Sequence, residues 1–200
     1  MLVLYPRIPI RPDFVRVITP IGENMSKTKQ KLFARVFAAS SMAAAFSAGA
    51  QVSTSGYVLP MNLALQGALE AVQTCAAKGY DVTATVVDVA GTPQVVLRGD
   101  HATIHTKDTA YRKAYTIVTM GPIFHLDVTS QFLDTLAKYP PLAAQGLAAT
   151  PNILALPGGA AIKVHDEIVA GIGVGGSPGG DKDEACAKAG VAKIQAGLPH

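Results

Sequence analysis

The stretch AIKVHDEIVAGIGV, residues 161–174, decides the fold. A run with alternating apolar residues, 161–165, and an apolar run, 168–174, flank the polar pair Asp166 and Glu167, a pattern typical of a β-hairpin. Gly171 and Gly173 interrupt the second run, and glycine inside a strand allows another part of the backbone to approach closely. The stretch therefore predicts two antiparallel strands, the second of which packs closely against its neighbours.

Outward from this hairpin, hydrophobic periodicity and turn residues predict the other elements. Helices are expected at 63–78, 106–120, 127–138 and 181–196, and further strands at 81–89, 94–98 and 153–156. Gly121 is expected to end the second helix, and Asp181 with Glu184 has the spacing of a capping box at the start of the last. Because hairpins dominate, we expect an α+β fold with a mainly antiparallel five-stranded sheet covered by helices. We expect one domain over residues 51–200.

The charge of the chain is divided unevenly. The whole sequence has 17 basic and 14 acidic residues, a net charge of +3. Residues 1–50 contain seven basic and two acidic residues, so they carry +5 and residues 51–200 carry −2. This distribution excludes a cationic nucleic-acid-binding domain, which needs its Lys and Arg on the folded part. The apolar runs are also shorter than the roughly 18–20 residues of a membrane span, so we expect no integral membrane segment.

Residues 25–50 resemble a secretory signal peptide. Four basic side chains follow Met25, an apolar stretch occupies 36–46, and Ala48-Gly49-Ala50 forms an Ala-x-Ala cleavage site. We expect cleavage between Ala50 and Gln51 and a periplasmic or secreted protein; the alternative is a short amphipathic or buried helix. Residues 1–24 contain four prolines and are interpreted as an upstream extension or a poorly ordered tail.

Export affects how the two cysteines are interpreted. Cys75 and Cys186 could pair in an oxidising compartment, or could be small core residues, and we favour two core residues. Their spacing matches no zinc signature.

Residues 98–115 are the densest polar stretch of the chain. His101 and His105 are four residues apart, which on one helix face would suit a metal ion, although a solvated loop is the more ordinary interpretation. His105 precedes the helix expected from Thr106, where backbone N–H groups attract anions. Arg112 and Lys113 add positive charge, which favours a carboxylate-bearing ligand such as haem or a small organic acid. Alternatively, they pair with Asp108 on the helix surface.

Seven short motifs carry a resemblance to a known family. They are VVDxxG at 86–91, LRxD at 97–100, HT at 105–106, RKAYT at 112–116, LPGGxxI at 156–162, VAGIGVGG at 169–176 and PGGDxDxxCAxAG at 178–190. In this order and spacing the chain resembles the haem-binding or haem-degrading family typified by GlcG and HbpS, and is similar to the PduO C-terminal domain. The resemblance covers about 60–196. It departs at His101, where this chain has Gly-Asp-His-Ala and similar sequences often have Asp-Gly-Ala.

The resemblance implies a fold and a class of ligand. The implied fold is a five-stranded antiparallel sheet with helices on its faces, a GlcG- and profilin-like arrangement. The implied assembly is a homo-oligomer, and haem or iron binding is implied for some members. Haem is therefore the expected cofactor. His105 is the first candidate iron ligand, and His125 and His165 could also serve.

Three functions follow from these observations. The first is haem binding, with iron on His105 and the ligand contacted by Arg98, Arg112, Lys113 or His101. The second is an enzyme acting on a small organic carboxylate, in which Asp88, Asp100 and His105 supply acid–base groups and Lys113 an electrophile or anion anchor. The third is a structural oligomeric subunit.

Overall fold

The structure is a computed structural model that describes residues 55–199. The expected signal peptide at 25–50 and the expected extension at 1–24 lie outside these residues. Within 55–199, no helix combines the length and the apolar character required to cross a membrane.

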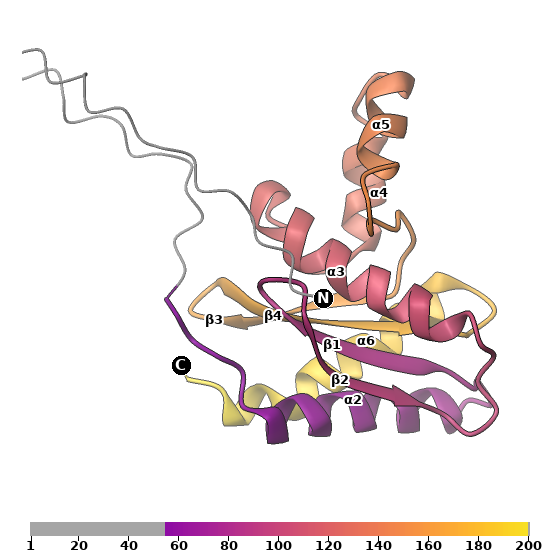
Figure 1. Ribbon diagram of the computed structural model, residues 1–200, viewed down its shortest axis with the longest axis vertical. Helices are drawn as coiled ribbons and strands as arrows, with labels where there is room; N and C mark the ends of the chain where they lie inside the picture. Colours follow the sequence, from indigo (N-terminus) through magenta and orange to yellow (C-terminus); the bar gives the residue numbers. More distant parts are fainter. Residues whose placement is uncertain (1–54, 200) are drawn as a thin grey trace, which may run out of the picture. The chain divides into compact units, whose positions relative to one another are not determined.

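Four strands and five α-helices make up the described domain (Figure 1). In chain order they are α2 (Met61–Ala76), β1 (Thr83–Asp88), β2 (Pro93–Arg98), α3 (Thr106–Phe124), α4 (Ser130–Leu136), α5 (Pro141–Ala148), β3 (Gly159–Val164), β4 (Glu167–Gly175) and α6 (Gly180–Ile194), followed by a 3-10 turn, Gln195–Gly197. All strand pairs are antiparallel, in the order β2-β1-β4-β3. The α+β class and both predicted hairpins are confirmed.

Helices cover both faces of the sheet. In Figure 1, α2 and α6 lie on one face, and α3 lies on the other with α4 and α5 beyond it. Side chains alternate along β1, so Ala84 and Val86 pack with α2 and α6, whereas Val87 packs with the cluster around α3. Two apolar cores therefore flank one sheet, and β4, in its centre, is buried on both sides.

The glycines of β4 seat α3 against the sheet. A Cβ atom at Gly173 would overlap the carbonyl oxygen of Ala110, and one at Gly171 would lie 2.8 Å from the carbonyl oxygen of Ala114. The predicted close backbone packing is therefore confirmed, and its neighbour is α3. This close approach fixes the position of the first half of α3, which carries the polar residues described below.

The two cysteines form a disulfide bond between α2 and α6. Cys75 and Cys186 are fully buried, with Cα atoms 5.7 Å apart and a sequence separation of 111. The prediction of two unpaired core residues is therefore wrong, and the alternative pairing is correct. The two interpretations are not exclusive, because the bonded pair is itself part of the core. Closing a loop of this length is expected to stabilise the fold by about 4–5 kcal/mol through the unfolded state.

The predicted strand at 153–156 is not a strand, so the sheet has four strands rather than five. The segment is attached to α3 by side chains: Arg112 Nη2 donates to Ile153 O at 2.5 Å, and Leu154 N donates to Thr116 Oγ1 at 2.8 Å. Ile153 is buried in the core beside α3. Its apolar character therefore reflects burial, and these bonds take the place of a strand ladder.

The helix predicted at 127–138 is shorter, and a further helix follows it. Val128 forms an isolated bridge to Ala160 in β3, so α4 begins only at Ser130. Pro140 and Pro141 directly follow this region, and Pro141 occupies the start of α5. Proline is tolerated there because its missing N–H has no partner in the first turn.

Two predicted helix ends also differ. Gly121 does not end α3, which continues through Pro122 to Phe124; the glycine lies inside the helix, where a Cβ would meet Ile168 Cδ1 at 2.5 Å. The N-cap of α6 is Gly179 rather than Asp181. The expected capping box does not form, since the Glu184 carboxylate instead accepts hydrogen bonds from Ser130 N and Oγ at the start of α4.

Candidate functional site

A polar pocket of about 240 Å³ lies between the first half of α3 and the loop that connects β4 to α6. His105, Thr109 and Lys113 are spaced by four residues, which places all three on one side of α3. The remaining lining comes from Leu156, Gly176, Ser177, Gly179, Gly180 and Asp183. The pocket therefore joins the polar stretch 98–115 with the glycine-rich loop at 176–180.

Lys113 forms a buried ion pair with Asp183 at the pocket. The Nζ–Oδ2 distance is 2.6 Å, and each residue is only 3% exposed. The other carboxylate oxygen, Oδ1, accepts the backbone N–H of Ser177 at 2.9 Å. An unpaired charge in this environment would be costly, so each partner requires the other. The pair thereby ties α3, the β4–α6 loop and α6 together.

His105 lies at the opening of this pocket. It precedes the first residue of α3, is exposed, and makes no side-chain capping bond to that helix. Its Nδ1 lies 3.1 Å from Thr103 Oγ1, and within residues 55–199 its Nε2 has no hydrogen-bond partner. The imidazole is therefore held through one nitrogen and presents the other to solvent.

Two helices begin beside the pocket. The start of α3 is at His105 and the start of α6 is at Gly179, and neither has a side-chain cap. Backbone N–H groups at helix starts favour anions, while Asp181 and Asp183 in the first turn of α6 reduce that preference. The pocket is therefore polar and close to neutral rather than strongly cationic.

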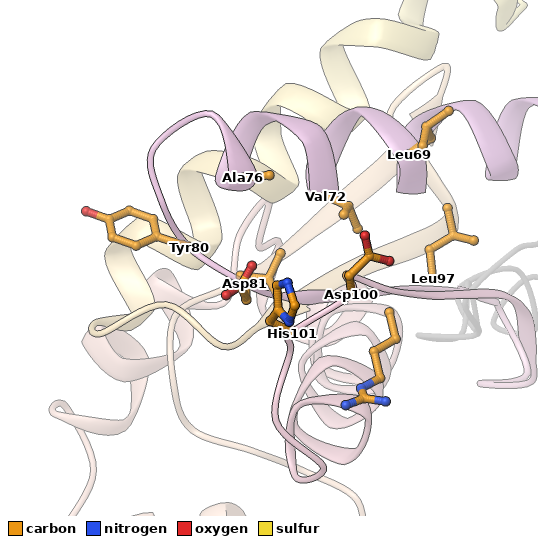
Figure 2. Close-up of a pocket in the computed structure, with 11 residues that line it drawn as sticks. Leu69, Val72, Ala76, Tyr80, Asp81, Leu97, Asp100 and His101 are labelled. Carbon is orange, nitrogen blue, oxygen red and sulfur yellow. The ribbon is translucent and has the colours of Figure 1, made fainter.

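Three of the predicted site residues line a different pocket. Arg98, Asp100 and His101 contribute to a groove of about 310 Å³ between α2 and the end of β2. Figure 2 shows Asp100 and His101 below α2, with Leu69, Val72 and Leu97 forming the apolar part and Tyr80 and Asp81 at the other end. The Arg98 guanidinium donates through Nε and Nη2 to Ala102 O.

Two further predicted residues have structural partners elsewhere. Asp88 Oδ1 accepts the N–H groups of Ala90 and Thr92 and so stabilises the β1–β2 turn. Arg112 is half-buried and bonds to Ile153 O. The alternative that Arg112 and Lys113 pair with Asp108 is wrong, because Asp108 is paired with Lys107 at 2.9 Å.

Two other histidines of residues 55–199 are on turns. His125 and His165 are exposed and adopt left-handed backbone conformations, with φ of 55° and 48°. His101 and His105 line different pockets. In the described part of the chain, no group of three or more His, Cys, Asp and Glu side chains could hold a metal ion.

Of the site residues predicted from the sequence, His105 and Lys113 line the same pocket. Asp183, which also lines it, was not among the predicted site residues. Asp183 is 70 residues from Lys113, so no local pattern connects them. The only available signal was its place in the motif at 178–190.

Comparisons with known proteins agree with this fold. A family model described as "Haem degrading protein HbpS-like" matches residues 59–192. A crystal structure of a double mutant of HbpS from Streptomyces reticuli is 37% identical, covers 75% of this chain and 96% of that chain, and superposes with a TM-score of 0.62. A structure of HbpS itself is 36% identical, with 73% and 96% coverage and a TM-score of 0.62.

A more distant structure supports the fold alone. The PduOC:haem complex is 24% identical over 69% of this chain and 96% of that chain, with a TM-score of 0.60. Among curated proteins, none matches. Because the HbpS-like model spans residues 59–192 and HbpS is more than 30% identical over most of its length, the chain belongs to the HbpS-like family of haem-degrading proteins.

Proposed function

We propose that this protein binds haem, with His105 as the ligand of the haem iron. The carrying observation is the exposed imidazole whose Nδ1 lies 3.1 Å from Thr103 Oγ1 and whose Nε2 faces solvent. Histidines that ligate metals generally form a hydrogen bond through the second ring nitrogen, which orients the ring. His105 has this arrangement.

The surroundings of His105 fit a flat, largely apolar ligand. Ile104 is 81% exposed and Leu156 is 49% exposed, so two large apolar side chains beside the imidazole lack a cover within residues 55–199. The pocket of about 240 Å³ is smaller than the ~300–1,000 Å³ of cavities that enclose drug-sized ligands. Haem would therefore lie against this surface rather than inside the pocket. When bound, it supplies an iron centre for ligand binding and one-electron chemistry.

The structure reduces the candidates for contact with the haem propionates. Lys113 is neutralised by Asp183 and buried, and Arg112 is half-buried and bonded to Ile153 O. Arg98 is exposed and retains guanidinium N–H donors beyond the two that bond to Ala102 O. We therefore assign propionate binding to Arg98 and a supporting role to the Lys113–Asp183 pair.

The acid–base residues expected for the enzymatic alternative do not lie together. Asp88 is at the β1–β2 turn, Asp100 is in the groove beside α2, and His105 is at the pocket of α3. These three side chains line no common pocket, so the arrangement expected for catalysis on a small carboxylate does not form.

The proposal includes export and self-association. Residues 25–50 have the charge, apolar stretch and cleavage site of a signal peptide, so the mature protein starts at Gln51 and works in the periplasm or outside the cell. N-terminal sequencing of the protein recovered from cells tests this, and an intact Met1 contradicts it. We also propose that the protein is a homo-oligomer.

Titration with haem tests the central proposal. The purified protein is expected to shift the Soret band at micromolar haem, and His105→Ala to weaken binding at least about tenfold because the iron loses a ligand. His125→Ala is the matched control, since this exposed histidine lies on the turn at the other end of α3. Absence of a Soret shift, or equal binding by His105→Ala and the unaltered protein, would overturn it.

A further inference from the structure

The groove between α2 and the end of β2 is separate from the pocket at His105. The two have no lining residue in common. The volume of the groove is about 310 Å³, at the lower end of the ~300–1,000 Å³ typical of cavities that hold small organic ligands. It therefore has the size of a site for a small molecule, and its lining decides which kind.

One wall of the groove is apolar. Val72 and Leu97 are half-buried and pack against the core beneath α2, and Leu69 beside them is 45% exposed. Gly99 adds no side chain to the groove, and a Cβ at this position would lie 3.8 Å from Val72 Cγ1. A short hydrocarbon chain that lies along this wall would remove apolar surface from water, which favours binding.

The polar side of the groove carries more negative than positive charge. Asp81 and Asp100 are exposed, and neither forms an ion pair with another of residues 55–199. Arg98 is the one basic side chain of the lining, and its Nε and Nη2 donate to Ala102 O. The lining therefore attracts a cation and disfavours a carboxylate.

His101 is the third polar group on this side. Figure 2 shows its imidazole between the side chains of Asp81 and Asp100. A primary ammonium group has three N–H donors, and two carboxylates with the free nitrogen of a neutral imidazole supply acceptors for them. Similar sequences often have glycine at this position, so this acceptor distinguishes the chain from them.

We propose that this groove binds a small primary amine, whose apolar chain lies against Val72 and Leu97 and whose ammonium group bonds to Asp100. The apolar wall selects an organic cation over a metal ion, and within residues 55–199 no group of three or more His, Cys, Asp and Glu side chains could hold a metal. The proposal does not depend on haem binding, because the groove and the pocket at His105 are lined by different residues.

NMR titration of the haem-free full chain with hexylamine tests the proposal. The amide resonances of Val72, Leu97 and Asp100 are expected to shift, with a Kd of about 1 mM or below, whereas that of Leu156 in the other pocket stays in place. Hexanol and hexanoate keep the chain but not the positive charge, and should bind at least about fivefold more weakly. Equal binding of hexanoate, or shifts confined to the pocket at His105, would overturn the proposal.

A matched pair of variants tests the ammonium contact. Asp100→Asn keeps the shape of the side chain and removes its charge, so hexylamine should bind at least about threefold more weakly. Asp134→Asn is the control, because Asp134 is exposed on α4, outside the groove, and forms no ion pair within residues 55–199. The same affinity in both variants would contradict the proposed ammonium contact.

Two exposed leucines of α2 test the apolar contact. Leu69 lines the groove, whereas Leu65, one turn earlier and 41% exposed, does not. Leu69→Ala should weaken hexylamine binding at least about threefold because the hydrocarbon chain loses apolar contact, and Leu65→Ala should leave it unchanged. Circular dichroism checks that both variants fold, and equal affinities would show that the chain does not lie along this wall, which overturns the proposal.

Discussion

Helices α3 and α5 lie on the same side of the sheet, and they represent opposite extremes of packing. Nine of the residues of α3 are buried, and four of its polar side chains bond to other segments, whereas none of the residues of α5 is buried. The polar side chains Lys113 and Thr116 are therefore fixed within one chain, since they bond to Asp183 and to the backbone of Leu154. The packing of α5 is incomplete in one chain. Helix α3 therefore positions side chains of the candidate ligand site, whereas α5 leaves its outer side exposed.

The largest effect is expected where the partner of a buried charge on α3 is removed. Lys113→Ala leaves the Asp183 carboxylate 3% exposed without its ion pair and also opens a cavity. The expected loss is about 3–5 kcal/mol in the free energy of unfolding, measured by urea denaturation. A loss below about 1 kcal/mol would show that this pair does not hold α3 in place.

A double variant distinguishes the charge from the packing. Lys113→Met with Asp183→Leu removes both charges and keeps most of the volume, so it should recover much of the stability lost by Lys113→Ala. If the double variant is less stable than either single variant, the pair contributes more than mutual neutralisation.

The next largest loss of stability is expected at Gly173 in β4, the strand against which α3 packs. Gly173→Ala places a Cβ against Ala110 O and the backbone of Ala114, and neither can move without shifting the helix. We expect a loss of about 1–3 kcal/mol from overpacking. Thermal unfolding measures it, and an unchanged Tm would mean that α3 does not lie as close to β4 as the structure shows.

Local patterns were sufficient for the parts of the fold made by neighbours in sequence. Both hairpins were predicted because a turn and two apolar runs are contiguous, and Gly173 indicated close packing. His105 and Lys113 reached one pocket because helical spacing places residues eight apart on the same side. These features depend on short-range geometry, which the sequence displays directly.

Such local patterns could not predict contacts between residues that are far apart in the sequence. Asp183 pairs with Lys113, which is 70 residues earlier, and Cys186 is bonded to Cys75, which is 111 residues earlier. No local pattern specifies either contact. The stretch 153–156 has the apolar character of a strand, but side chains of α3 satisfy its backbone instead. The second proline of Pro140-Pro141 begins a helix, because proline at that position both ends one element and fits the start of the next.

The smallest effect, of opposite sign, is expected on α5. Gly146 lies inside this helix with negative φ, and a Cβ there would meet no atom within 4 Å. Gly146→Ala should therefore stabilise the protein by about 0.5–1 kcal/mol through helix propensity, whereas the same change at Gly173 destabilises it. Urea denaturation of both variants measures the two changes in the free energy of unfolding. If Gly146→Ala leaves the stability unchanged, the helix of α5 is fixed by its contacts with the core beside α3 rather than by helix propensity.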